Sequence, residues 1–298
     1  MKTTDSHLFR IADFLVGIDF APSTVNGMSL IPSLEPFRCR DDAAGDMLFH
    51  LTVDDSLPVI KKQHRERIGC FDTGNGETAV DRLSDGGYQY IIRDIGHSDC
   101  CLLQTDKHFA DCRCALNGDT MMRAYGLMNA LMLIFAFAGG RRRTLMVHAS
   151  ALLYNGRGYA FIAKSGTGKS THVNQWMRAI DGCEILNDDT PILRLMPDGV
   201  YIYGTPWSGK TTCYRQRKAP LAAITRIERA TTNSIERHAT LHAFACLYPS
   251  CSTMKWDSDI FDDLCRNVTS IVETTPIYTL HCLPEEAAAK LCHATIAT

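Results

Sequence analysis

Apolar and polar residues alternate in short runs along the first 118 residues, as in strands that each bury one face. The runs Met47–Val53, Tyr88–Arg93 and Cys101–Gln104 follow this pattern, and a turn-forming stretch at Asp72–Glu77 interrupts them. No cluster of catalytic residue types accompanies these runs. The pattern predicts a β-rich N-terminal domain over residues 1–118.

The pattern changes at 121–138, where the chain becomes almost continuously apolar. Gly126 and Asn129 interrupt the run, which only just reaches the length needed to span a bilayer. A membrane helix flanked by Arg141–Arg143 is one interpretation. A buried helix between two domains is the interpretation that we favour, because no second spanning segment exists.

Strand-like and helix-like periods alternate after this helix. Leu145–Leu153 and Tyr159–Ala163 read as strands joined by a hairpin turn at Tyr154–Gly158, and Lys169–Ile180 reads as a helix with one apolar face. A hairpin that leads directly into the segment between Ala163 and Lys169 is unusual for a nucleotide-binding fold. Such a fold commonly reaches the equivalent segment through a parallel βαβ unit.

The remaining segments alternate in the same way. Strands are predicted at Cys183–Thr190, at 222–228 and at Ile277–Leu283. Asp257–Val272 has a helical stripe, and Pro284 with the acids after it opens a final helix. The mixture predicts an α/β (α+β) fold, with a catalytic domain over residues 119–298 that follows the β-rich domain.

Length, charge and cysteine usage narrow the class of protein. The chain has 298 residues, enough for two domains, and a net charge of −2, which provides no basic field for nucleic acid or for anionic lipid. The N-terminal residues lack the apolar core of a secretory signal. We therefore expect a cytoplasmic protein that binds neither nucleic acid nor a membrane.

The 13 cysteines are odd in number and show no paired CxxC spacing, so we expect reduced thiols that are mostly buried. A zinc site is the alternative for one cluster, although its spacing matches no standard framework. That cluster consists of His97, Cys100, Cys101, His108, Cys112 and Cys114.

A glycine-rich segment follows the second of the hairpin strands and ends in Lys169 and Ser170 at the predicted helix start. Backbone N–H groups and a helix N-terminus bind phosphates in such a segment, the lysine reaches the β- and γ-phosphates, and the hydroxyl takes Mg²⁺. Ala163 stands where the P-loop pattern has its first glycine, and a literal match, Gly204–Thr211, lacks a following helix. The residues assigned to the triphosphate are Ser165, Gly166, Thr167, Gly168, Lys169, Ser170 and Thr171.

Two adjacent acids end the strand after this helix. Phosphoryl transfer needs a metal and a group that orients or deprotonates the acceptor, and Asp188 and Asp189 can supply both. Neighbouring strand residues point to opposite faces, so both can serve only where the chain turns, as Pro191 suggests. The alternative is that one of them is a solvated loop residue. His148 lies on the strand that we expect to pair with the strand before the phosphate loop, although an isolated histidine is commonly a core residue.

A second polar loop contains Trp207 and Lys210, with Arg215 shortly after it. These residues are candidates for contacting a phosphate or an anionic acceptor, because cations stabilise developing negative charge. A basic surface turn is the alternative.

These motifs occur in an order that resembles the catalytic domain of HPr kinase/phosphorylase, a P-loop fold related to ATP-dependent phosphoenolpyruvate carboxykinase. The resemblance rests on Val147–Ser150, Ser165–Thr171 and Asn187–Asp189, and covers roughly residues 140 to 290. It implies ATP and Mg²⁺ as cofactors, with Asp188 as proton acceptor and His148 and Lys169 beside it in the catalytic site. It also implies Ser170 and Asp189 in the metal region.

The chain departs from that family at Ala163 and in its Gly204–Lys210 loop, where the family has a signature loop with Glu and Arg. The departures point to a divergent branch, and they argue against HPr as the substrate and against phosphorylase activity. We therefore expect an ATP- and Mg²⁺-dependent kinase that phosphorylates a hydroxyl, preferably a serine, of a protein, peptide or small molecule. A nucleotide-binding ATPase or switch, or a peptide-binding module without transfer, is the alternative, and carboxykinase activity ranks lower. The sequence is compatible with a homo-oligomer.

Overall fold

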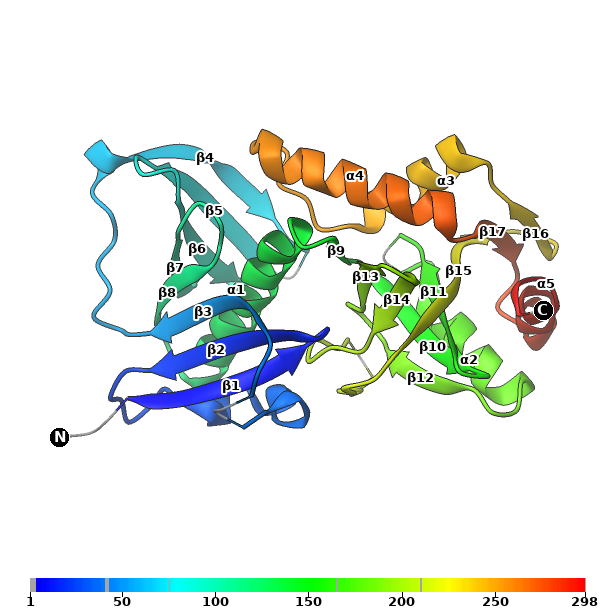
Figure 1. Cartoon of the computed structure of the whole chain (residues 1–298), viewed down its shortest axis with the longest axis horizontal. Coiled ribbons are helices and arrows are strands. Elements are labelled where there is room, and N and C mark those ends of the chain that lie inside the picture. The colour runs from blue at the N-terminus through cyan, green and yellow to red at the C-terminus, as the bar shows by residue number, and fades with distance from the viewer. Residues whose placement is uncertain (1–3, 41–42, 75, 165, 210, 298) are drawn as a thin grey trace. The chain divides into compact units, whose positions relative to one another are not determined.

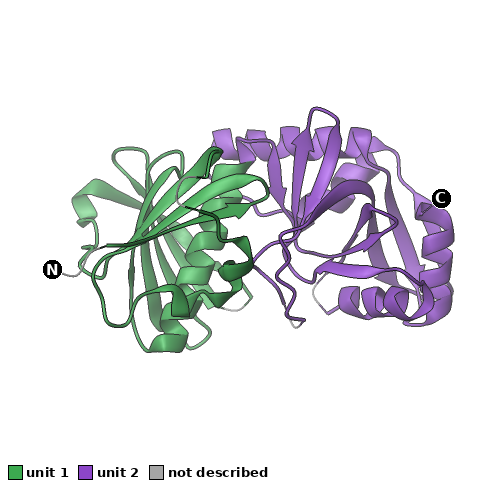
Figure 2. Ribbon diagram, turned by 60° about the horizontal axis from the view of Figure 1, so that its bottom comes forward, with its two compact units in different colours: residues 1–139 green, residues 140–298 purple. Residues whose placement is uncertain are grey.

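The computed structural model describes residues 4–40, 43–74, 76–164, 166–209 and 211–297. The chain forms two compact units, Met1–Gly139 and Gly140–Thr298 (Figure 2). Each unit contains one β-sheet, and the described residues include five α-helices, so the fold is mixed α/β of the α+β kind. This agrees with the coarse fold class that the sequence predicts.

The first unit is built on an eight-stranded sheet with the strand order β1-β2-β3-β8-β7-β6-β5-β4 (Figure 1). The β2–β3 and β3–β8 pairs are parallel, and the other neighbours are antiparallel. Its strands are β1 Asp5–Ile11, β2 Phe14–Phe20, β3 Asp46–Val53, β4 Arg65–Asp72, β5 Gly76–Leu83, β6 Tyr88–Asp94, β7 Asp99–Thr105 and β8 Asp111–Leu116. Short 3-10 helices lie at η1 Met28–Leu30, η2 Pro32–Phe37 and η3 Lys62–His64. The β-rich character expected for residues 1–118 is therefore confirmed.

The apolar helix α1, Thr120–Gly140, packs against this sheet. The rings of Phe135 and Phe14 lie 6.4 Å apart. A Cβ on Gly126 would come within 2.8 Å of the Cys101 side chain, so glycine permits a close approach of helix and strand. These contacts explain why the unit boundary falls at 139/140 and not at 118/119, where the sequence suggested it. By length and composition α1 could also cross a bilayer, and 39% of its most apolar window is buried.

The second unit is built on a nine-stranded sheet. Its main order is β12-β10-β11-β15-β14-β13-β9, and β17 pairs with both β15 and β16. Its strands are β9 Thr144–Met146, β10 Ala149–Tyr154, β11 Arg157–Ile162, β12 Glu184–Asn187, β13 Ile192–Met196, β14 Gly199–Tyr203, β15 Lys218–Arg229, β16 Ser234–Arg237 and β17 Ile277–Cys282. Its helices are α2 Lys169–Ala179, α3 Thr240–Leu247, η4 Tyr248–Ser250, α4 Ser258–Thr274 and α5 Glu286–Ile296.

Helices cover both faces of this second sheet (Figure 1). One apolar cluster joins the sheet to α3 and α4, and includes Leu247 and Val268. The other joins the opposite face to α2 and α5, and includes Trp176 and Ala289. Because β11 lies in the middle of the sheet between β10 and β15, the segment that follows it is held on a buried and rigid support.

The hairpin predicted before the phosphate loop is confirmed. Tyr154 pairs with Arg157 across a two-residue turn, in which Asn155 and Gly156 both have positive φ (49° and 73°). Asn-Gly is the preferred pair for such a turn, because both positions require left-handed backbone.

The single strand predicted at Leu145–Leu153 is wrong in one respect. The structure divides it into β9 and β10, and His148 lies in the interruption. There the backbone N–H of Val147 donates to the Pro191 carbonyl, and that of His148 donates to the Ser250 carbonyl. The first bond continues the pairing of β9 with β13, whereas the second leads to a segment outside the sheet. The His148 side chain is half exposed, at 49%. The sequence also gave no signal for α3 and β16.

Candidate functional site

The phosphate-loop segment joins the central strand β11 to the N-terminus of α2. Gly166 and Gly168 have φ values of 74° and 125°, which residues with a side chain rarely adopt. Ala163 is not among the residues with positive φ, so alanine is tolerated where the P-loop pattern has glycine. The N-cap residue of α2 is Gly168, which has no side chain that could accept from the first N–H groups, so among the described residues these groups are available to an anion. Ser165, which the sequence assigned to the triphosphate, lies outside the described residues.

Arg229, the last residue of β15, holds the carbonyl groups of this loop. Its Nη2 donates to the Gly166 carbonyl over 2.6 Å, and its Nε donates to the Thr167 carbonyl over 3.1 Å. A carbonyl oxygen facing a phosphate would repel it, so a guanidinium that binds these oxygens favours a loop that presents N–H groups to the anion. This contact could not be predicted from the sequence, because Arg229 is more than 60 residues from the loop.

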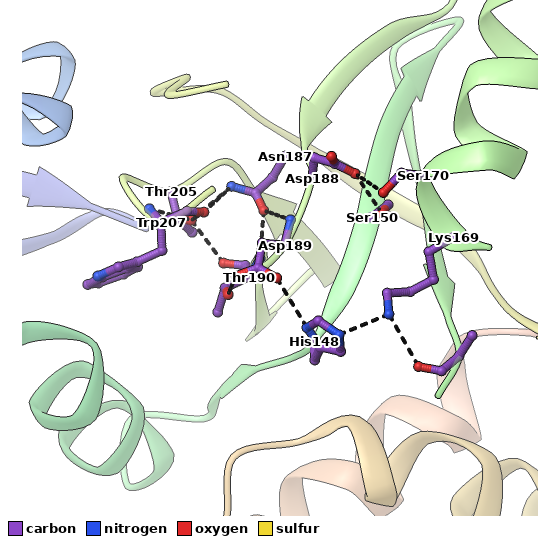
Figure 3. Close-up of polar contacts among 11 residues, drawn as sticks. His148, Ser150, Lys169, Ser170, Asn187, Asp188, Asp189, Thr190, Thr205 and Trp207 are labelled. Carbon is purple, nitrogen blue, oxygen red and sulfur yellow. Dashed lines mark hydrogen bonds and ion pairs between the residues drawn. The ribbon is translucent and has the colours of Figure 1, made fainter. Parts of the chain in front are cut away.

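Lys169 reaches the acid pair through His148 (Figure 3). Lys169 Nζ lies 2.9 Å from His148 Nε2, and His148 Nδ1 lies 3.3 Å from an Asp189 carboxylate oxygen. A protonated lysine is a donor only, so we assign the imidazole as neutral, with Nε2 as acceptor and the proton on Nδ1. Lys169 also donates to the Ala163 carbonyl over 3.3 Å.

The charges in this chain of contacts affect one another. Burial lowers the pKa of the Lys169 ammonium, and the nearby carboxylates of Asp189 and Asp188 oppose that effect. Burial raises the pKa of Asp189, but hydrogen bonds from His148 and Thr190 outweigh it, so this pKa lies below its usual value. Asp189 is therefore an anion throughout the neutral range.

Asp188 faces a different set of partners. One of its oxygens, Oδ1, accepts hydrogen bonds from the hydroxyl groups of Ser150 (2.9 Å) and Ser170 (3.0 Å). The other, Oδ2, is buried and has no hydrogen-bond partner among the described residues. A buried carboxylate oxygen without a donor is costly unless a cation or water satisfies it.

The structure pairs Asp188 with the phosphate-loop hydroxyl of Ser170 and Asp189 with His148. The roles expected from the resemblance, with Asp188 as proton acceptor and Asp189 in the metal region, stay predictions. The two acids do point to different partners, as expected for a chain that turns after a strand. Thr171, at the exposed side of the first turn of α2, contributes no hydrogen bond to either acid among the described residues.

Asn187 creates the turn that separates the two acids (Figure 3). Its side-chain oxygen accepts from the backbone N–H groups of Asp189 and Thr190, at 2.9 and 2.8 Å. Its amide nitrogen donates to the Thr205 hydroxyl and the Trp207 carbonyl, at 2.9 and 2.8 Å. The side chain is completely buried, so it connects the acidic turn rigidly to the loop after β14.

The second polar loop is therefore adjacent to the acids, and the part of it that the structure describes places no cation beside them. Trp207 contributes its backbone carbonyl and is itself buried. Arg215 pairs with Glu184, at the start of β12, over 3.0 Å, and so lies at the other end of this strand from the acids. Lys210 lies outside the described residues. The structure thus pairs Arg215 with Glu184 and does not bring it to the phosphate loop.

The part of the chain that the structure describes contains no site at which protein residues alone enclose a metal. Among the described residues, no group of three or more His, Cys, Asp or Glu side chains could hold an ion. The cysteines of the cluster weighed as a zinc site lie instead in β7 and β8, where all four are buried. This agrees with the interpretation as buried thiols of strands.

Sequence reasoning missed Ser150, Asn187 and Arg229 as functional residues. A signal existed for Ser150, because it lies two positions after His148 and residues at that spacing share one face of a strand. A signal existed also for Asn187, since an asparagine at a strand end favours a turn in which its side chain binds the backbone two residues on. A scan against protein-family models finds no match to this chain, and a search of curated proteins finds none either.

Proposed function

We propose that the second unit is an ATP- and Mg²⁺-dependent kinase domain of the HPr-kinase-like P-loop type, which transfers the γ-phosphoryl group to a hydroxyl. One observation carries the proposal. Two neighbouring phosphate-loop residues contact the two acids of one turn. Lys169 contacts His148, which contacts Asp189, and Ser170 donates directly to Asp188. Phosphate clamp, metal ligand and proton acceptor are therefore adjacent, as phosphoryl transfer requires.

The binding of the phosphates falls to the loop. The N–H groups at the start of α2 and the Lys169 ammonium supply positive potential, and Arg229 holds the loop carbonyls of Gly166 and Thr167. Lys169 has three N–H donors, of which two contact His148 and Ala163, so one remains for a phosphate oxygen.

The residues around Asp188 fit a magnesium ion that arrives with the nucleotide. Mg²⁺ keeps several waters and binds one or two carboxylates together with substrate phosphates. Ser170 and Asp188 offer one hydroxyl and one carboxylate, and the buried Oδ2 of Asp188 has no protein donor among the described residues. When bound, Mg²⁺ would neutralise charge on the β- and γ-phosphates. Ser150 holds the carboxylate in place through its own hydroxyl.

His148 and Asp189 fit the removal of the acceptor proton. Both Asp189 oxygens are engaged, one with His148 and the other with the Thr190 hydroxyl. Asp189 orients the imidazole and stabilises a positive charge on it, which leaves Nε2 as the atom that accepts a proton. Nε2 becomes available for this task when Lys169 turns from it towards a phosphate.

The test is transfer of label from γ-labelled ATP in the presence of Mg²⁺, with a lysate fractionated into small molecules and proteins as acceptor. We expect a labelled, acid-stable phosphoester with the wild type and none with Lys169→Ala. Lys290→Ala, which changes an exposed lysine on α5, is the matched control and should retain transfer. Label recovered only as free phosphate would instead support an ATPase switch, and equal weak nucleotide binding by wild type and Lys169→Ala would refute the proposal.

A further inference from the structure

A pocket of about 410 Å³ opens beside the phosphate loop. The loop residues Gly166–Gly168 and the adjacent Thr171 line part of it, and the junction between β17 and α5 at Leu283–Glu285 lines another part. The end of β15 contributes Ile227 and Ala230. The volume lies within the range of small-molecule sites, and the pocket is continuous with the loop that we assign to the phosphates.

The most buried polar side chain that lines this pocket is His172, on the first turns of α2. Its side chain is 4% exposed, and it lies edge-on to the Phe161 ring with 4.9 Å between centroids. The indole N–H of the fully buried Trp176 donates to His172 Nε2 over 3.0 Å. This bond fixes the tautomer, so the second ring nitrogen, Nδ1, carries the proton.

That N–H has no acceptor within the described part of the chain. Burial lowers the pKa of His172 to about 4, so the ring is neutral at physiological pH. A neutral donor with a fixed orientation on the wall of a pocket is well suited to recognise an acceptor atom on a ligand. The mechanism proposed above does not use this group.

We propose that this pocket binds the nucleoside of the triphosphate and that His172 Nδ1–H donates a hydrogen bond to it, a proposal that rests on the proposed function. The apolar side chains of Ile227, Ala230 and Leu283 suit the faces of a base, and His172 with the Gln175 amide suits its polar edge or the ribose. His172 would thus be a specificity-determining residue, distinct from the residues that hold the phosphates.

The test compares the affinities for inorganic triphosphate and for ATP, GTP and CTP, each with Mg²⁺, by calorimetry. Inorganic triphosphate occupies the phosphate loop but lacks a nucleoside. We expect at least one nucleotide to bind about 10-fold more tightly than inorganic triphosphate, or better, because a nucleoside adds buried area and a hydrogen bond.

Two variants of His172 separate the donor from the packing. His172→Asn retains an amide N–H near the Nδ1 position, whereas His172→Gln retains an acceptor for Trp176 but removes the donor from the pocket. We expect His172→Gln to weaken nucleotide binding about 3- to 10-fold, the value of one neutral hydrogen bond, and to leave inorganic triphosphate binding unchanged. His172→Asn should bind the nucleotide more tightly than His172→Gln.

A third variant does not depend on a buried position. Ala230→Trp places a large side chain in the pocket, while the backbone N–H of Ala230 can still donate to the Cys282 carbonyl. It should lose the nucleotide preference and keep inorganic triphosphate.

The outcomes distinguish the two proposals. If the wild type binds inorganic triphosphate as tightly as every nucleotide, or if Ala230→Trp keeps the preference, the pocket assignment is overturned and the phosphate loop stands. Equal losses for both ligands in His172→Gln would also overturn it, since His172 would then act through the loop. If the wild type binds neither ligand, the proposed function fails and the pocket assignment fails with it.

Discussion

The Lys169 ammonium lies 2.9 Å from Nε2 of His148, and this contact joins the phosphate loop to the acidic turn. The two residues are 21 positions apart and come from the helix and from the interruption between two strands. His148 in turn contacts Asp189, so an anion that binds the loop changes the electrostatic environment of the Asp189 carboxylate. A phosphate that draws Lys169 away from His148 would free the nitrogen that the proposed mechanism needs as a proton acceptor.

Substitution of the two aspartates should impair different functions of the protein. Asp189→Asn should retain Mg²⁺-dependent nucleotide binding and lower turnover by about 10²- to 10⁴-fold, the usual contribution of general-base catalysis. Asp188→Asn should weaken Mg²⁺–nucleotide binding by about 10-fold or more, because a hydrogen bond or contact to a charged group contributes roughly 1.5–3 kcal/mol. Calorimetry measures nucleotide binding by the two variants, and phosphate release measures their turnover. A turnover defect in Asp188→Asn together with a binding defect in Asp189→Asn would support Asp188 as the base.

Neither amide substitute for His148 should support turnover. His148→Asn can still donate to Asp189, and His148→Gln can still accept from Lys169, but an amide does not take up a proton at neutral pH. We expect both variants to bind nucleotide within about 3-fold of wild type and to lose turnover by about 10²-fold or more. Either variant retaining more than a tenth of wild-type turnover would contradict the assignment of Nε2 as the base.

Removal of the Arg229 guanidinium should loosen the phosphate loop. Arg229→Gln loses its charged hydrogen bonds to the carbonyls of Gly166 and Thr167, so affinity for inorganic triphosphate should fall about 10- to 100-fold. Arg226→Gln is the matched control, because Arg226 lies on the same strand but pairs with Glu228. A similar effect of both variants would show that general positive charge matters rather than the loop contacts.

Asn187 should contribute to the stability of the fold through the hydrogen bonds of its side chain. Asn187→Ala leaves the buried N–H groups of Asp189 and Thr190 without their acceptor, and should lower the free energy of unfolding by about 2–4 kcal/mol. Asn174→Ala, at an exposed position of α2, should change it by less than about 0.5 kcal/mol. Urea unfolding measures both, and equal stabilities would mean that the turn forms without this side chain.

The stability contributed by Asp189 should depend on pH in a definite direction. Folding lowers the pKa of this carboxyl, so its contribution is fully present above the unfolded-state pKa of about 3.9 and is lost as the pH falls through the folded-state value. The difference in unfolding free energy between wild type and Asp189→Asn should shrink as the pH falls below about 4. A difference that persists unchanged at pH 3 would argue against a lowered pKa.

Thr190→Val offers an internal check on this pH dependence. It removes one of the hydrogen bonds that lower the Asp189 pKa. The loss of stability with acid should therefore begin at the same pH in Thr190→Val as in the wild type, but should be smaller and complete at a higher pH.

The sequence by itself determined the local elements of the site. Asn155–Gly156 specifies the hairpin turn, the glycines at 166 and 168 specify a backbone that few other residues adopt, and the apolar stripe of α2 specifies a helix after them. These features depend on neighbouring residues, so they can be read from a linear chain. The pairing of β10 with β11 was also predictable, because only two residues separate them.

Only the tertiary structure decided which acid serves which partner. The choice depends on the turn that Asn187 makes with the loop at Thr205–Trp207, and on the break at His148 that Ser250 stabilises through its carbonyl. Those contacts join segments 18 to about 100 residues apart, and no local periodicity encodes them. Arg229 and Arg215 show the same limit. Arg229 ends β15 and Arg215 lies shortly before it, but the first contacts the phosphate loop and the second contacts Glu184, because long-range strand order places them beside different partners.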